Sequence, residues 1–332
     1  MMISPDVYVE GYRNKSYKEL LMVRDELLKE IRAFENHTYS SVFEMIHPSP
    51  EVVYQCNLEY LGKLCELIAE KYNQEYVWGD TNDDSYLEVI RDFLEAKGIG
   101  YNTALTEEIE KRKTGKKYTI RDHLRGMIYS LLSNQTKWYR IEPHLLEIDK
   151  LFYDYDPKML LAADPEHFCQ GLFDMKCGNM NTKAQMKALA DNIHTFHRIE
   201  TEYGSIDSFI TSEPADIIVQ KLSKATSPYK MKMLGEALAW EYLRNVGIDG
   251  AKPDTHLRRF LGADRMGTGL HSPATISEVN EQIASLSEKT GMTKVEVDNL
   301  IWSFCADGFG EICTAKPHCE VCPIVEWCCY KT

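Results

Sequence analysis

Apolar residues recur every three or four positions along most of the chain, which is the spacing of one face of an α-helix. In residues 17–36, for example, Leu20, Leu27 and Ile31 share such a face, and charged residues lie between them. Similar patterns occupy residues 51–72, 84–97, 139–153, 157–173, 182–203, 205–211, 214–224, 275–288 and 293–304. No convincing alternation of period two marks a strand. The pattern therefore predicts an all-α chain in which helices pack on helices.

Capping and stop signals place three further helices. Thr119, with Asp122 three residues on, forms a start signal for an apolar run that ends near Gln135. Asp254 follows a proline and stands where it can cap a helix over 255–261. A third helix ends at Gly247, but its start is open. It begins either at 227–228, a Ser-Pro pair, or after a tight turn at 235 between two short helices.

Charge divides the chain unevenly. The formal net charge is −13, and residues 1–110 hold 22 Asp and Glu against 10 Lys and Arg, whereas the remainder holds 29 against 28. At 332 residues the chain has room for two or three domains. We predict that residues 1–110 form an acidic helical accessory region that does not lie along a phosphate backbone. The basic stretch 111–117 is either a solvated linker or part of a nucleic-acid surface.

The N-terminus has no basic segment followed by an apolar run, and no stretch of about eighteen apolar residues occurs anywhere. We therefore expect a cytoplasmic protein, nucleoid-associated or nuclear according to the cell type, with no membrane partner. In a reducing compartment, ten cysteines fit a metal site and buried thiols better than a disulfide framework.

Four cysteines close to the C-terminus have the spacing C-x5-C-x2-C-x5-C. Four thiolates this close together usually bind zinc or an iron-sulfur cluster. Zinc ribbons pair two C-x2-C knuckles across a long insert, whereas only one such knuckle is present here, and this favours a single loop around a cluster. Cys329 directly follows Cys328, so the identity of the fourth ligand is open by one residue.

Four landmarks occur in one order over residues 118–330: LLSNQT (131–136), GNMNTKA (178–184), KPDTHLRR (252–259) and CTAKPHCEVCPIVEWC (313–328). Together they resemble the helix-hairpin-helix DNA glycosylases, in particular the endonuclease III branch with its C-terminal iron-sulfur cluster loop. The resemblance implies a two-lobed helix-hairpin-helix glycosylase fold with an extra N-terminal helical region. Its six-helix barrel-like lobe would span 118–249 and contain a degenerate hairpin, and the catalytic-Asp and cluster lobe would span 250–332 with part of the N-terminal helices.

The same resemblance implies roles for single residues. Asp254 would be the catalytic carboxylate, which suits a reaction that builds positive charge on a deoxyribose. Gln135 would fill the gap that a flipped base leaves in a duplex. Separately from the resemblance, backbone amides around Gly235 at a helix start could bind one phosphate. Lys183, Arg258 and Arg259 are either contacts for other phosphates or solvated surface residues. A [4Fe-4S] cluster, with zinc as the alternative, would be bound by Cys313, Cys319, Cys322 and Cys328. The expected partner is double-stranded DNA, bound by a monomer.

Two departures from the family pattern qualify these expectations. The first interval in the cysteine loop is five residues where the family usually has six. In the hairpin, the position of the family's Schiff-base lysine falls on Glu236 or Ala237, which predicts a monofunctional glycosylase unless Lys230 or Lys232 replaces that lysine. A non-catalytic DNA-binding protein of the same fold and a zinc-bearing interaction protein are the competing hypotheses. The sequence does not indicate which base is excised.

Overall fold

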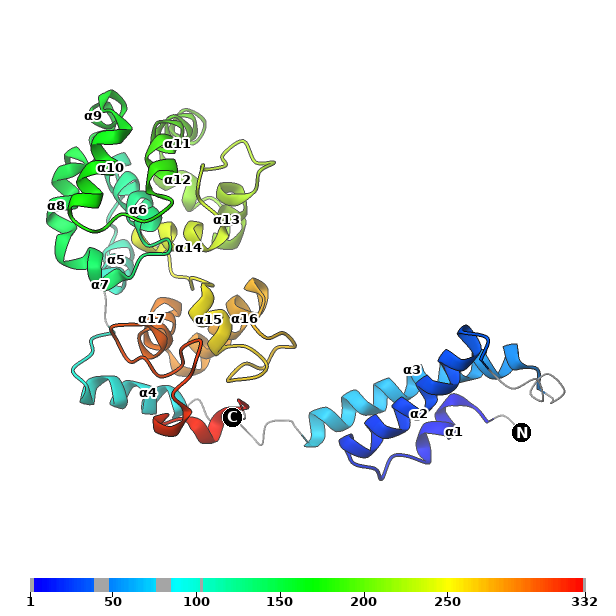
Figure 1. Ribbon diagram of the computed structural model, residues 1–332. Coiled ribbons are helices and arrows are strands. Elements are labelled where there is room, and N and C mark those ends of the chain that lie inside the picture. The colour runs from blue at the N-terminus through cyan, green and yellow to red at the C-terminus, as the bar shows by residue number, and fades with distance from the viewer. Residues whose placement is uncertain (1–2, 39–47, 76–84, 102–103, 331–332) are drawn as a thin grey trace. The chain divides into compact units, whose positions relative to one another are not determined.

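The computed structural model describes residues 3–38, 48–75, 85–101 and 104–330. Every regular element within these ranges is a helix, so the prediction of an all-α chain is confirmed (Figure 1). The chain forms two compact units, Met1–Asp83 and Asp84–Thr332. None of the described helices combines the length and apolar character that a membrane span needs.

The first unit contains three helices around its own small core. They are α1 (Pro5–Glu10), α2 (Tyr17–Glu35) and α3 (Pro50–Glu75). Ser16 and Glu19 close a reciprocal capping box at the start of α2. Leu20 and Leu64 are fully buried between α2 and α3.

The second unit holds the remaining helices. In chain order they are α4 (Ser85–Ala96), α5 (Ala104–Lys113), α6 (Ile120–Leu132), α7 (Trp138–Ile141), η2 (Glu142–His144), α8 (Leu145–Leu151), η3 (Tyr153–Tyr155), α9 (Pro157–Ala162), α10 (Pro165–Asp174), α11 (Thr182–Tyr203), α12 (Ile206–Ile210), α13 (Ala215–Ser223), α14 (Glu236–Asn245), α15 (Thr255–Phe260), α16 (Ile276–Thr290), α17 (Lys294–Cys305), η4 (Cys319–Val321) and η5 (Val325–Trp327).

One core of this unit forms around α6 and α14 and draws on residues from Tyr118 to Val246. The two helices approach closely at Gly126, where an added Cβ would lie 3.0 Å from Val246 Cγ1. The Asn245 amide donates to the Gly126 carbonyl at 2.9 Å and fixes the register of the two helices. The end of α6, and with it Gln135, is therefore positioned by α14.

A second core joins α4 to the C-terminal helices α15, α16 and α17 and to the cysteine loop. Ile90 and Leu94 of α4 are fully buried in it, beside Phe260 and Phe304. The charge pattern predicts one accessory region over residues 1–110, whereas the two compact units divide between Asp83 and Asp84. The difference arises because the apolar face of α4 is covered by residues that lie far away in the sequence.

Prolines interrupt two of the expected helices. The segment 139–153 divides at Pro143 into α7, η2 and α8, and the segment 157–173 divides before Pro165, where Asp164 caps α10. Proline lacks the N–H that a helix interior needs, so the apolar pattern continues while the hydrogen-bond ladder stops. The helix ending near Gly247 begins only after Gly235, which is the N-cap of α14.

The basic stretch at the end of α5 is docked onto the first core. Arg112 donates to the Val246 carbonyl at 2.8 Å and pairs with Asp207 at 2.7 Å. Glu108 accepts hydrogen bonds from Lys111, Lys116 and the Tyr118 hydroxyl. Burial alone would raise the pKa of Glu108, but these hydrogen bonds outweigh it and lower the pKa to about 2. A free solvated linker is therefore the wrong description of this stretch.

Glu108→Gln should destabilise the protein at pH 7 by about 2 kcal/mol, because the carboxylate loses charged hydrogen-bond partners. The carboxylate contributes stability above its unfolded pKa of 4.5, and this contribution is lost as the pH falls toward 2. The difference between wild type and variant in the free energy of unfolding should therefore shrink over that range. Glu110→Gln, which breaks an exposed pair with Lys113, is the control and should change little. A difference that does not vary with pH would contradict this assignment.

Candidate nucleic-acid interface and metal centre

Asp254 lies at the end of the segment that connects α14 to α15 and so leads from the first core to the second. It is half-buried, and its Oδ1 accepts the backbone N–H groups of His256 at 2.7 Å and Leu257 at 3.2 Å. Asp254 therefore caps α15, as its sequence position predicts. Two donors at a helix start hold the carboxylate in one orientation.

Lys252 connects this segment to the end of α6. Its Nζ donates to Ser133 Oγ at 3.0 Å, across 119 positions of sequence. Ser133 is the C-cap of α6 and stands two residues before Gln135. Lys252 lies two residues before Asp254 and Ser133 two residues before Gln135, so their hydrogen bond links the two candidate residues.

Gln135 occupies a turn that a second turn supports. Its φ is +55°, its side chain is exposed, and its Oε1 accepts from Asn181 at 3.2 Å. Asn179 Nδ2 donates at 2.8 Å to both the Asn134 carbonyl and the Thr136 hydroxyl. The structure therefore brings the LLSNQT and GNMNTKA landmarks side by side.

Met180 lies between these two asparagines and is 85% exposed. Sequence reasoning missed it as a functional candidate, although an apolar side chain inside a polar turn was the available signal. Exposed apolar side chains of this kind are inserted between base steps by proteins that kink a duplex.

The predicted phosphate contacts are in different surroundings. Lys183 is exposed and pairs loosely with Glu166 at 3.8 Å. Gly235 is also exposed, and a Cβ there would meet nothing within 4 Å, so the start of α14 is open. By contrast, Arg258 Nε donates to the Ala274 carbonyl at 2.8 Å and Arg259 Nε to the Cys313 carbonyl at 3.3 Å. Both guanidinium groups therefore bind the chain itself.

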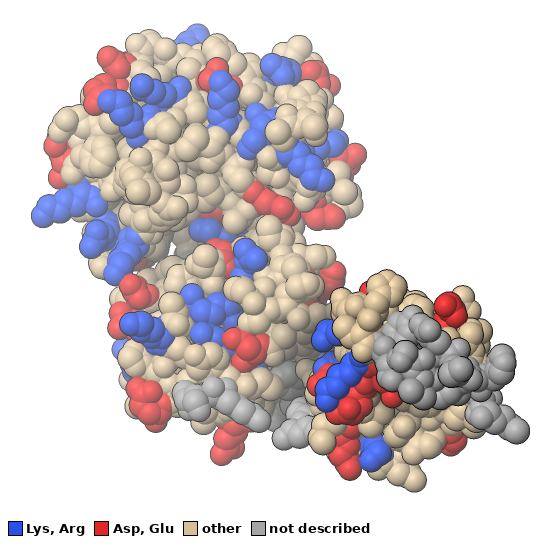
Figure 2. Space-filling view, turned by 45° about the vertical axis from the view of Figure 1, so that its right-hand side comes forward, with Lys and Arg blue, Asp and Glu red and all other residues tan. Residues whose placement is uncertain are grey.

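On one face of the second unit, the basic side chains are dispersed (Figure 2). On the face that Figure 2 shows, Lys and Arg side chains lie among acidic and uncharged ones and do not merge into one stripe. This fits a protein with an overall negative charge, in which a few placed contacts and not a broad basic surface would meet phosphates.

The hairpin between α13 and α14 contains a residue with a left-handed backbone. Met233 has a φ of +60°, a conformation that costs a residue with a Cβ on the order of 1 kcal/mol. The Glu236 carboxylate accepts from Gln220 at 3.0 Å. The turn at Met233 and the contact between Gln220 and Glu236 together lead the chain into α14.

Lys230 and Lys232, the two lysines considered as possible nucleophiles, both have partners in the chain. Lys230 Nζ donates to the Leu234 carbonyl, and burial lowers the pKa of its ammonium. Lys232 Nζ pairs with Asp191 of α11 at 2.6 Å. Ala237, in the first turn of α14, offers no amine.

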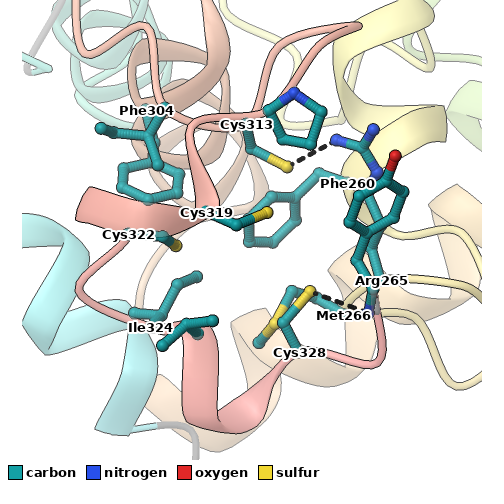
Figure 3. A pocket seen from close by; sticks show the side chains of 13 residues that line it. Phe260, Arg265, Met266, Phe304, Cys313, Cys319, Cys322, Ile324 and Cys328 are labelled. Atoms are coloured by element: carbon teal, nitrogen blue, oxygen red, sulfur yellow. Dashed lines mark hydrogen bonds between the residues drawn. The ribbon is translucent and has the colours of Figure 1, made fainter. Parts of the chain in front are cut away.

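The four predicted cysteines line one pocket (Figure 3). Its walls also include Phe260, Phe304 and Ile324, and it encloses about 380 Å³ counting its mouth. Cys329 is exposed and does not line the pocket, and its backbone N–H donates to the Arg265 carbonyl at 2.9 Å. The geometry therefore favours Cys328 as the fourth thiol.

Cys313 is in the most strongly polarised environment of the four. A hydrogen bond from the Cys305 thiol, opposed by burial and assisted by Arg265, lowers the pKa of Cys313 to about 6. Arg265 is 4% exposed, and its Nη1 donates to Cys313 Sγ at 2.9 Å (Figure 3). Burial raises the pKa of Cys328 to about 11.

The chemical types of these side chains are those that bind an iron-sulfur cluster. Four thiols from one loop, apolar walls and a hydrogen bond to one sulfur are the protein groups that such clusters use. Within the described part of the chain, no three His, Cys, Asp or Glu side chains are gathered in the arrangement of a metal-ion site.

No protein-family model and no curated protein sequence matches the chain. Among solved structures, an 8-oxoguanine glycosylase/lyase from Methanocaldococcus jannaschii, in complex with a 15-mer DNA containing 8-oxoguanine, is similar at a TM-score of 0.44 and 16% sequence identity. The match covers 65% of this chain and 96% of that chain. A similarity at this level assigns neither a family nor an activity, so the functional argument depends on the residues described above.

Cysteine variants test the pocket directly. Cys328→Ala should lower the metal content of the purified protein and its thermal midpoint, because a thiol that lines the pocket is lost. Cys329→Ala, the matched control one residue on, should leave both unchanged. Iron and zinc are measured together, so the same experiment identifies the metal. Equal metal loss in the two variants would contradict the assignment of Cys328.

Proposed function

We propose that this chain is a DNA N-glycosylase that extrudes a damaged, mismatched or modified base from a duplex and hydrolyses its N-glycosidic bond. The observation that carries the proposal is the Lys252–Ser133 hydrogen bond, because it ties the segment before Asp254 to the helix end that presents Gln135. The same contact therefore helps to position both Asp254, which is suited to a reacting sugar, and Gln135, which is suited to a distorted duplex.

Asp254 would serve the chemical step. Breaking the bond between base and deoxyribose builds positive charge on the sugar, and a fixed carboxylate stabilises that charge and can orient the attacking water. The two N–H groups that bind Oδ1 keep the carboxylate in place before substrate arrives. Loss of one such preorganised group typically costs about 3 to 4 kcal/mol of barrier.

The paired turns would serve the extrusion step. A base inside a duplex is out of reach, so the enzyme must occupy the gap that the flipped nucleotide leaves. Gln135 is exposed beyond the end of α6 and can stack and form hydrogen bonds there. Met180 stands on the adjoining turn and would act as an apolar wedge.

Hydrolysis without strand cleavage is the mode that the hairpin supports. A lyase of the resembled type needs a free amine near the start of α14, where Ala237 stands. Lys230 Nζ donates to the Leu234 carbonyl, and Lys232 Nζ forms an exposed pair with Asp191. We therefore propose a monofunctional enzyme that leaves an abasic site.

The cysteine pocket would hold a [4Fe-4S] cluster, with zinc as the alternative, on Cys313, Cys319, Cys322 and Cys328. The bound group would supply folding energy to a loop that has only two short 3₁₀ turns of its own. Arg259 connects this loop to α15 through the Cys313 carbonyl, so an ordered loop would help to hold the helix that Asp254 caps.

A non-catalytic DNA-binding protein is the second candidate. Met233 and Glu236 favour it, because a left-handed methionine and an acidic side chain replace groups that would approach a phosphate more easily. Duplex binding without base release would establish this alternative.

Asp254→Asn should abolish base release while duplex binding is retained. Single-turnover reactions on a panel of duplexes, each with one lesion, mismatch or modified base, should show a loss of about a hundredfold to a thousandfold on the duplex that wild type processes. Strand breaks should appear only after alkali treatment. Breaks without alkali that borohydride traps would mean that a lysine acts as nucleophile and would contradict the hydrolytic mode.

Met180→Ala and Gln135→Ala should each slow base release from a duplex by about tenfold and have little effect on a single strand that carries the same base. The difference is expected because a single strand needs no unstacking. Leu146→Ala is the matched control, because Leu146 is also an exposed apolar side chain but lies on a different element, α8. Equal losses on duplex and single strand would rule out a wedge role.

A further inference from the structure

Four charged side chains are buried together next to the segment that ends in Asp254. Arg244 and Glu241 come from α14, Asp298 from α17 and Lys252 from the connecting segment. Arg244 and Asp298 are 3% and 2% exposed, Glu241 is 9% exposed, and the Lys252 side chain is 15% exposed. Lys252 enters the sequence-based predictions only as the first residue of a landmark, and the other three have no predicted role, although an aspartate inside the apolar run of α17 is a visible anomaly.

The contacts form one continuous network. Arg244 Nη1 donates to Asp298 at 3.0 Å and Nη2 to Asn299 at 2.7 Å. Glu241 lies 3.6 Å from Arg244 and 3.7 Å from Lys252. Two basic and two acidic side chains therefore face one another, and charges in a protein interior need such paired partners.

Asp298 acts on the backbone as well as on Arg244. Its Oδ2 accepts the Lys252 backbone N–H at 2.6 Å. The Lys252 carbonyl in turn accepts the Asp254 N–H at 2.7 Å, across the buried and rigid Pro253. Asp298 thus anchors a short stretch of chain of which Asp254 is the far end.

The charge of Asp254 affects the pKa values of two residues of the network. Burial raises the pKa of Asp298 to about 7 against the effect of Arg244, and the charges of Asp254 and Glu241 add to the rise. The charge of Asp254 also favours the ionised form of Arg244.

We propose that Asp298 is a positioning residue for the proposed glycosylase reaction: through the Lys252 backbone it holds the Asp254 carboxylate in register with the end of α6. The inference rests on the proposed function. The α15 N-terminus fixes the orientation of the carboxylate, and Asp298 fixes where that N-terminus begins relative to Ser133 and Gln135. A displacement of about 1 Å at a reacting group can cost on the order of a hundredfold in rate.

Asp298→Asn is the primary test. The amide keeps the volume but leaves Arg244 without its carboxylate, so the acceptor of the Lys252 N–H is no longer held in place. Single-turnover base release is measured over a series of enzyme concentrations, on the duplex that wild type processes. The limiting rate should fall by about tenfold to a hundredfold, while the half-saturating concentration stays within about threefold.

Asp249→Asn is the matched control. Asp249 belongs to the same connecting segment and also binds α17, through the N–H groups of Lys294 and Val295, but it does not contact the network. Its loss should lower the thermal midpoint and leave the limiting rate unchanged. Equal rate losses in the two variants at equal loss of stability would reduce Asp298 to a structural residue and overturn the inference.

Asp298→Glu covers the case in which the asparagine variant does not fold. Glutamate keeps the charge for Arg244 but displaces the carboxylate from the Lys252 N–H by one methylene, so the limiting rate should again fall. A wild-type limiting rate in either folded variant would overturn this inference and leave the proposed function untouched. Absence of base release by wild type on every duplex would instead contradict the proposed function.

Discussion

Burial of ionic groups beside the connecting segment is the constraint on which the rest of the site depends. Arg244, on a helix of the first core, pairs with Asp298, on a helix of the second core. Both side chains are buried. Breaking such a pair leaves an uncompensated charge in the interior and typically costs about 3 to 5 kcal/mol. The two cores of the second unit are therefore joined by a contact that is expensive to distort, and Asp254 is attached to it through two peptide groups.

Local sequence signals predicted most helices because each signal acts within one turn. Thr119 and Asp122 close the capping box they suggested, and Gly247, the expected stop signal, follows α14 in a left-handed conformation. Asp254 caps α15 for the same reason. The spacing of the cysteines likewise predicted residues that share one pocket, since a loop of sixteen residues can bring its own side chains together.

Long-range features could not be predicted in this way. The contact from Lys252 to Ser133 and the burial of α4 beside Phe260 and Phe304 join residues that periodicity treats as independent. Met233 shows a different limit, because its side chain gives no sign of the left-handed backbone that it adopts. The sequence places Met180 in a polar turn, but only the fold shows that its side chain is exposed beside Gln135.

The most direct test of the account is the release of free base by the wild-type protein from a panel of duplexes that each carry one lesion, mismatch or modified base. The account predicts that one class of duplex yields free base and an abasic site that breaks only under alkali. Retained duplex binding with no free base from any member of the panel would contradict it and would favour a DNA-binding protein without catalytic activity.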